Sequence, residues 1–219
     1  MNQIPRSTFV PAALLAGLCP LAANSVYEDT AGSGAEILVE AAAAQPVAAT
    51  ISVVLFLVGF LALIVVLGVL AAAIARRTPA LSGIVVVAGA AAVAIKLAEA
   101  QTGIALRETA GALDPGTAEA LVAIDAAGFA VYGFLLALAL GAAGLGLLRS
   151  GATAARLGWW ATVMGGLGVL TAAVGIVVPD AYVPIPFVLL LVWLIALGIA
   201  GTRRPFPQLV AQGSALATQ

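Results

Sequence analysis

Long apolar segments, separated by short polar connections, occupy most of this chain. They cover about residues 7–23, 47–75, 81–105, 117–148, 157–178 and 185–201. A bilayer core about 30 Å thick needs roughly 20 helical residues to cross it. The apolar residues run continuously instead of alternating with polar ones, which favours helices over barrel strands. The pattern therefore predicts an all-α membrane protein, a bundle of six transmembrane helices.

The basic residues indicate how these helices are threaded. Most arginines fall at segment ends that alternate crossings place on one side of the membrane: Arg6, Arg76, Arg77, Arg149, Arg156, Arg203 and Arg204. The opposite ends are acidic, with Arg107 as their one arginine: Glu28, Asp29, Glu36, Glu40, Glu108, Asp114, Glu119 and Asp180. Because basic residues concentrate on the cytoplasmic side, both termini are expected on the cytoplasmic side of the membrane. Residues 1–204 then form one transmembrane domain and 205–219 a short cytoplasmic tail.

The first apolar segment allows two interpretations. It is short, it contains Pro11 and Pro20, and it follows Arg6. The small residues Ala22, Ala23 and Ser25 lie at or just after its end, so a cleaved secretory signal peptide over about 1–25 has a similar pattern. Cleavage would leave five spans and an N-terminus outside the cell. We favour a retained helix over 7–23.

Composition removes several classes of function. Hydrophobic residues make up 63% of the 219 and charged residues 9%, whereas a soluble domain carries about 25% charged residues. There is no histidine and one cysteine, Cys19, so the commonest general base and metal ligand is missing from the sequence. The net charge of −1 gives no case for nucleic acid. The sequence predicts no catalytic residue, metal or cofactor. The expected partners are the lipid bilayer and a protein partner or second copy.

One group of charged residues lies near the apolar runs. Lys96 follows Arg77 by about 28 Å of helix, and Asp125 precedes Arg149 by about 36 Å. Both should therefore lie near the outer interface. Lys96 and Glu99 share a helical face at three-residue spacing, and Lys96 and Asp125 are nearly equidistant from the 106–116 turn. We predict a Lys96–Glu99 or Lys96–Asp125 ion pair, either as a clamp between helices or as a polar binding spot. The middle of the bundle is expected to be free of charge.

Local motifs refine the connections and the packing. Ser33 and Glu36 form a capping-box pattern that predicts a short helix over about 35–44. Asp114 and Pro115 should cap and begin the fourth segment. Glycines crowd the last three segments, which favours close packing within the bundle or, alternatively, a homo-oligomer face. These are Gly141, Gly144, Gly146, Gly165, Gly166, Gly168, Gly175, Gly198 and Gly201.

Several boundary patterns together resemble a known group of proteins. They are the acidic first outer loop, Arg76-Arg77-Thr78-Pro79, Arg156-Leu157-Gly158-Trp159, and Pro186-Phe187 followed by Trp193 and Arg203-Arg204. In these features the chain resembles small six-helix integral membrane proteins of high-GC, actinobacterial-like bacteria, a family of unknown function. The resemblance implies that the first segment stays as a helix, and it transfers no catalytic residue.

Three functions are compatible with this pattern. The first is a non-enzymatic structural or partner-binding bundle, which we favour. The second is a carrier or receptor for an apolar or lipid-like molecule, held between the helices. The third is a membrane enzyme that uses outer carboxylates such as Glu28, Asp29, Glu108 and Asp180, and it would need at least three of them to converge.

Overall fold

A computed structural model describes residues 6–26, 45–109, 115–150, 155–178 and 183–203. Within these ranges, some side chains toward the ends of the helices are not described, among them those of Arg6, Asp125 and Arg203. The helices are α1 (Arg6–Val26), α3 (Pro46–Ile74), α4 (Pro79–Thr109), α5 (Pro115–Ser150), α6 (Ala155–Val177) and α7 (Ile185–Arg203). All six are long and apolar enough to cross a membrane, as the sequence predicts.

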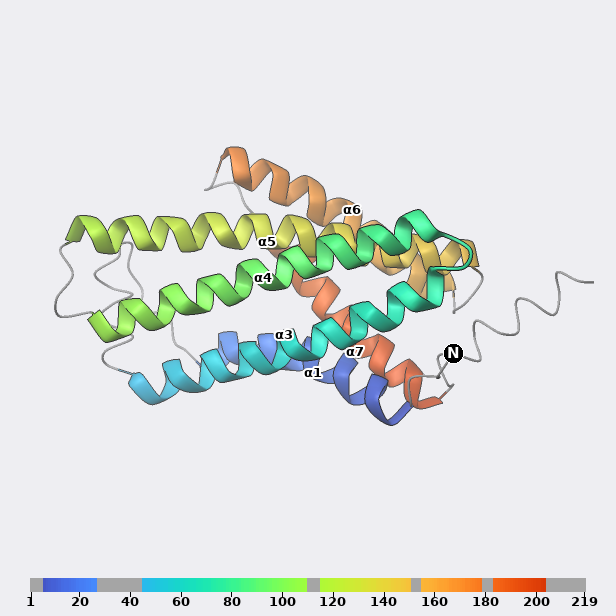
Figure 1. The fold of residues 1–219 in the computed structure, drawn as a ribbon, viewed down its shortest axis with the longest axis horizontal. Coiled ribbons are helices and arrows are strands. Elements are labelled where there is room, and N and C mark those ends of the chain that lie inside the picture. The colour runs from blue at the N-terminus through green and yellow to red at the C-terminus, as the bar shows by residue number, and fades with distance from the viewer. Residues whose placement is uncertain (1–5, 27–44, 110–114, 151–154, 179–182, 204–219) are drawn as a thin grey trace, which may run out of the picture.

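The six helices form a closed bundle in which neighbours in the chain are neighbours in space. Each helix packs against the next one along the chain, and α7 returns to contact α1. Helix α5 also contacts α3 and α7, so it occupies the most central position. Successive helices run in opposite directions through the bundle (Figure 1). This short-loop, antiparallel order is what the brief connections in the sequence require.

Helix α1 is an integral part of the bundle. Its buried residues include Phe9, Ala13 and Ala16, and it packs against α3 and α7. Pro20 lies inside α1, where its ring packs against Gly59 of α3; a Cβ on Gly59 would lie 2.8 Å from the Pro20 Cδ. Pro20 is therefore compatible with a packed helix, because neighbouring helices and side chains support such breaks.

Glycines bring the backbones of α5 and α6 into contact. A Cβ on Gly165 would lie 2.8 Å from the backbone nitrogen of Gly141, and one on Gly144 would lie 2.8 Å from the carbonyl oxygen of Gly158. No side chain fits at either position unless the helices separate. The predicted use of these glycines in packing within the bundle is confirmed here. Gly166 differs, since a Cβ there would meet open space.

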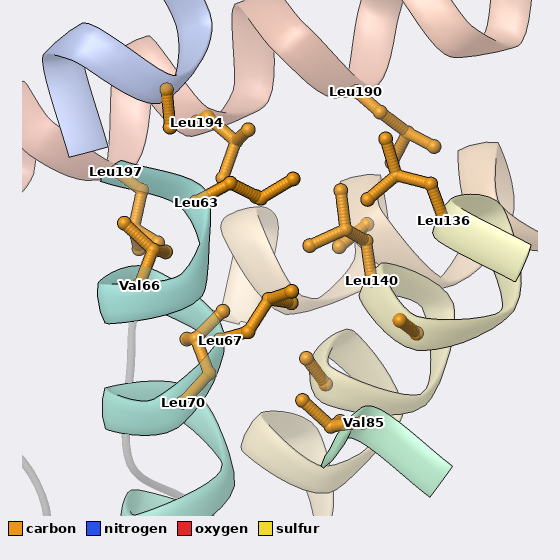
Figure 2. Packing of buried hydrophobic residues seen from close by; sticks show 14 of the residues in the cluster. Leu63, Val66, Leu67, Leu70, Val85, Leu136, Leu140, Leu190, Leu194 and Leu197 are labelled. Atoms are coloured by element: carbon orange, nitrogen blue, oxygen red, sulfur yellow. The ribbon is translucent and has the colours of Figure 1, made fainter. Parts of the chain in front are cut away.

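The core consists of interlocked aliphatic side chains from several helices. Figure 2 shows leucines of α3, α5 and α7 pointing toward one another, with Val85 of α4 beneath them. Leu70, Leu140 and Leu194 are completely buried. In lipid, apolar burial alone does not favour association, so close van der Waals packing and interhelical hydrogen bonds stabilise the bundle. Three such hydrogen bonds join neighbouring helices. Trp193 Nε1 donates to the Leu157 carbonyl at 2.8 Å, Ser82 Oγ donates to the Ala71 carbonyl at 2.9 Å, and Ser52 Oγ donates to the Ala23 carbonyl at 3.1 Å.

The arginine-bearing ends of the helices lie together. Arg6 begins α1, Arg149 lies in the last turn of α5, and Arg203 ends α7; the turn after α3 carries Arg76 and Arg77. Arg77 also donates a hydrogen bond to the backbone carbonyl of Ser150, which ties this turn to the end of α5. Figure 1 shows these ends at the same end of the bundle. We refer to it as the arginine end and to the opposite end as the outer end.

Some predictions fall on residues that the structure does not describe. The short helix over 35–44, Asp114 as a cap and the tail 205–219 all lie outside the described residues. Pro115 is the first residue of α5, as the sequence predicts.

Candidate functional site

Lys96 and Glu99 form an ion pair on one face of α4. Lys96 Nζ contacts Glu99 Oε2, one turn further along the helix. This is one of the two pairs that the sequence predicts. The other, Lys96–Asp125, involves a side chain that lies outside the described residues. The Lys96 and Glu99 side chains are 13% and 9% exposed. The pair is therefore enclosed by protein and does not stand at an open mouth of the bundle.

Helix α5 provides aromatic rings for the ammonium group of Lys96. Nζ lies 4.5 Å from the ring centroid of Phe129 and 5.1 Å from that of Tyr132. Both distances are within the roughly 6 Å over which the negative face of a ring attracts a cation. Phe129 and Tyr132 are three residues apart, which puts them on one face of α5. Lys96 therefore bridges α4 and α5 through charge and aromatic contact together.

A glycine on α5 leaves space for the carboxylate. A Cβ added to Gly128 would lie 2.5 Å from Glu99 Oε1. Any larger residue at position 128 would push the carboxylate away from α5. The sequence Gly128-Phe129 thus presents a flat site to Glu99 and a ring to Lys96. We call Lys96, Glu99, Gly128, Phe129 and Tyr132 the α4–α5 latch.

The latch continues into an aromatic cluster built by three helices. Tyr132, which is 1% exposed, packs edge-to-face against Phe60 of α3 and Phe187 of α7, with ring centroids 5.8 and 5.6 Å away. Phe129 also packs edge-to-face on Phe187, at 5.7 Å. Edge-to-face pairs of this kind each stabilise by about 0.5–1.5 kcal/mol beyond their burial. The charged pair on α4 is thereby connected to α3, α5 and α7.

The electrostatics of the latch favour keeping the two charges together. Removing one partner of a buried pair costs about 3–5 kcal/mol, because the other charge is left without compensation. The rings add a further attraction of about 2 kcal/mol for a desolvated cation. Such an arrangement stabilises a particular orientation of α4 on α5. It also places the charged ammonium group of Lys96 against the ring of the buried residue Tyr132.

Sequence reasoning did not assign the aromatic half of the latch. The sequence predicted no site role for Tyr132, Phe129, Phe60 or Phe187. One signal was available. In an antiparallel hairpin that turns at 106–116, Phe129 and Tyr132 come to about the level of Lys96, and rings at that level are natural partners for its ammonium group.

The structure brings no metal-ligand set together in the part of the chain that it describes: no three carboxylate or cysteine side chains there converge on a point. Of the outer carboxylates considered for catalysis, Glu28, Asp29 and Asp180 lie outside the described residues, as does the side chain of Glu108.

The geometry defines the chain as a multi-pass, all-α integral membrane protein with a charged, aromatic latch between α4 and α5. No protein-family model matches it, and comparison with curated proteins and with solved structures finds no significant similarity.

Proposed function

We propose that this chain is a non-enzymatic helical bundle of a bacterial plasma membrane that serves as a structural or partner-binding component. The observation that supports the proposal most directly is the latch. Lys96 and Glu99 face each other and α5, at 13% and 9% exposure, so their charges stabilise helix packing. The backbone contact of α5 with α6 and the leucine core in Figure 2 likewise stabilise helix packing.

A test of this proposal is native mass spectrometry of the protein extracted from its own membrane in mild detergent. We expect a complex with a stoichiometric protein partner. Isolation of the chain by itself, with a lipid-like molecule retained through delipidation, would instead favour a carrier or receptor. The two outcomes differ in the mass of the bound species, so one experiment separates them.

The proposed orientation has its own test. Ala80 and Glu119 are exposed and lie near the arginine end and the outer end, respectively. In a chain with Cys19→Ser, a membrane-impermeant maleimide applied to intact cells should label Glu119→Cys and leave Ala80→Cys unlabelled until the cells are opened. Labelling of Ala80→Cys from outside would reverse the orientation inferred from the arginines.

A further inference from the structure

Three exposed arginines come close to one another where α5 ends. Arg77, in the turn after α3, donates a hydrogen bond to the backbone carbonyl of Ser150, the last residue of α5. Arg149 directly precedes Ser150 and its side chain is exposed. Figure 1 shows the turn between α3 and α4 beside the end of α5 and the beginning of α6, at the arginine end of the bundle.

The first turn of α6 contributes the third arginine. A Cβ on Gly158 would lie 2.7 Å from Leu148 Cγ, so the beginning of α6 is in contact with the last turn of α5. Arg149 follows Leu148 directly, and the exposed Arg156 precedes Gly158 by two residues. The hydrogen bond and this contact therefore hold three arginines around one meeting point of α3, α5 and α6. We call Arg77, Arg149 and Arg156 the arginine junction.

The helices around the junction provide no acidic side chain to balance its charge. The sequence contains no aspartate or glutamate over residues 41–98 and 126–179, which include all of α3 and α6 and the parts of α4 and α5 near the arginine end. A guanidinium has several N–H donors, so the bond to Ser150 leaves others of Arg77 available. Positive charges this close repel one another unless they share an anion. The junction is therefore suited to an anion with several acceptor oxygens.

The surroundings of the junction indicate that this anion belongs to a lipid. Trp159 lies one turn after Arg156 and is 60% exposed, and exposed tryptophans are typical of the head-group level of a membrane. Val163 and Leu170 continue the same face of α6 and are 46% and 65% exposed. Because α6 is long and apolar enough to cross a membrane, this face contacts acyl chains. A head-group phosphate at the junction thus has room for its acyl chains along α6.

We propose that the arginine junction binds the phosphate of an anionic phospholipid, whose acyl chains lie against the exposed face of α6. Guanidinium groups bind phosphate oxygens through paired hydrogen bonds, which makes arginine well suited to this ligand. One bound lipid connects the turn after α3, the end of α5 and the beginning of α6. The site is independent of the proposed function, because a structural bundle and a carrier can both hold a lipid at their surface.

Lipid titration of the detergent-purified chain, followed by native mass spectrometry, tests the site. The probes are phosphatidylglycerol and phosphatidylcholine with identical acyl chains, of which only the first has a net negative charge. We expect the first phosphatidylglycerol to bind at least about tenfold more tightly than phosphatidylcholine. Arg149→Gln combined with Arg156→Gln should weaken its binding about 10- to 30-fold, since each arginine at a lipid surface contributes about fivefold. Arg77 stays in place because its bond to Ser150 supports the fold.

A matched control separates the junction from the overall charge. Arg107→Gln removes one positive charge from α4 beyond the Pro79–Gln101 span, toward the outer end, whereas Arg149→Gln removes one at the junction. Arg107→Gln should leave binding of phosphatidylglycerol unchanged. An equal loss in these two single variants, or equal binding of both lipids by the wild type, would overturn the proposal. Displacement of the lipid by an excess of inorganic phosphate would also overturn it, because the ligand would then be free phosphate.

A second measurement locates the lipid without changing an arginine. Phosphatidylglycerol brominated on its acyl chains, as a minor component of phosphatidylcholine nanodiscs, should quench the tryptophan fluorescence of the wild type more than the same fraction of brominated phosphatidylcholine. The excess quenching should disappear in Trp159→Phe and shrink in concentrated salt, because ions screen charges beyond about 3 Å at 1 M. Equal quenching by the two lipids would contradict the site, even if the arginine variants did not fold.

Failure of this site and failure of the proposed function give different results. If the chain copurifies with a protein partner and shows no preference for phosphatidylglycerol, the lipid site is wrong and the function stands. If a lipid-like molecule survives delipidation in the variant with Arg149→Gln and Arg156→Gln, it lies elsewhere in the bundle. That result would favour a carrier over the proposed function.

Discussion

Helix α5 is held by its two neighbours in opposite ways. Against α6, the contact is between backbones, because Gly141 and Gly165 carry no side chains that would keep the helices apart. Against α4, the contact is between long side chains, with Lys96 reaching the rings of Phe129 and Tyr132. The α5–α6 interface depends on glycines that have no side chain, and the α4–α5 interface depends on particular charged and aromatic side chains.

The two interfaces therefore differ in what they tolerate. A backbone contact is stabilised by many small dispersion attractions between atoms, and all of them are lost when the helices separate. A charged contact depends on a few strong interactions that must stay balanced. We expect steric substitutions to damage α5–α6 most and charge substitutions to damage α4–α5 most. The following variants test that division, from the largest expected effect to the smallest.

The largest effect is expected at the α5–α6 crossing. Gly165→Leu should prevent the native bundle from forming, since even a Cβ at this position would lie 2.8 Å from the Ala137 carbonyl oxygen. Size-exclusion chromatography in detergent should show loss of the monodisperse peak. Gly166→Leu is the matched control one residue away, where a Cβ meets open space, and it should elute as the wild type does. Equal behaviour of the two variants would contradict the backbone-contact interpretation.

Next comes the charge balance of the latch. Lys96→Met should lower the free energy of unfolding by about 3–5 kcal/mol, because the largely buried Glu99 carboxylate loses its counter-charge. Thermal unfolding in detergent, followed by circular dichroism, measures the change. The exposed residue Glu119 provides a control, and Glu119→Gln should leave the unfolding midpoint unchanged.

The companion variant separates charge from packing. Lys96→Met combined with Glu99→Met should recover most of the lost stability, since replacing a whole buried pair by apolar groups is often neutral or stabilising. A double variant as unstable as Lys96→Met would show that the latch acts through shape and not through charge.

Part of this fold could be predicted from the sequence. The six spans follow from continuous apolar runs, whose length is dictated by the bilayer. Their neighbours follow from short connections. Helical spacing makes Glu99 one of the two partners that the sequence allows for Lys96, with Asp125 as the other. The signal-peptide alternative for 7–23 arose from the short apolar run, from Arg6 before it and from the small residues near its end.

The rest depended on contacts between distant residues. Glycines were recognised as packing residues, but which of them face α5 or α6 is set by helix rotation, so Gly165 and Gly166 could not be distinguished. In the same way, nothing local marks Phe129 as a partner of Lys96. That assignment requires the register of the α4–α5 hairpin, which the sequence determines only to within a few residues.

A smaller effect is expected from the coupling between the cation and its ring. In a double-mutant cycle, Lys96→Met and Phe129→Leu should show a coupling free energy of about 1–2 kcal/mol, from the cation–π contact. The same cycle with Phe56→Leu is the control, because Phe56 stacks on Phe60 at 5.8 Å, whereas Phe129 lies directly against the Lys96 ammonium group. Similar coupling in both cycles would attribute the effect to general repacking of the aromatic cluster.

The smallest effect concerns a bond that supplements the backbone contact of α6. Trp193 of α7 is completely buried and donates from Nε1 to the Leu157 carbonyl in the first turn of α6, at 2.8 Å. Trp193→Phe keeps most of the ring and removes the donor, so unfolding should become easier by about 1 kcal/mol. Trp159→Phe changes a residue that is 60% exposed and should have no measurable effect. If Trp193→Phe were instead as damaging as Gly165→Leu, α6 would be held chiefly by α7. The close glycine contact between α5 and α6 would then result from the attachment of α6 to α7. It would no longer explain why α5 tolerates different substitutions on its two faces.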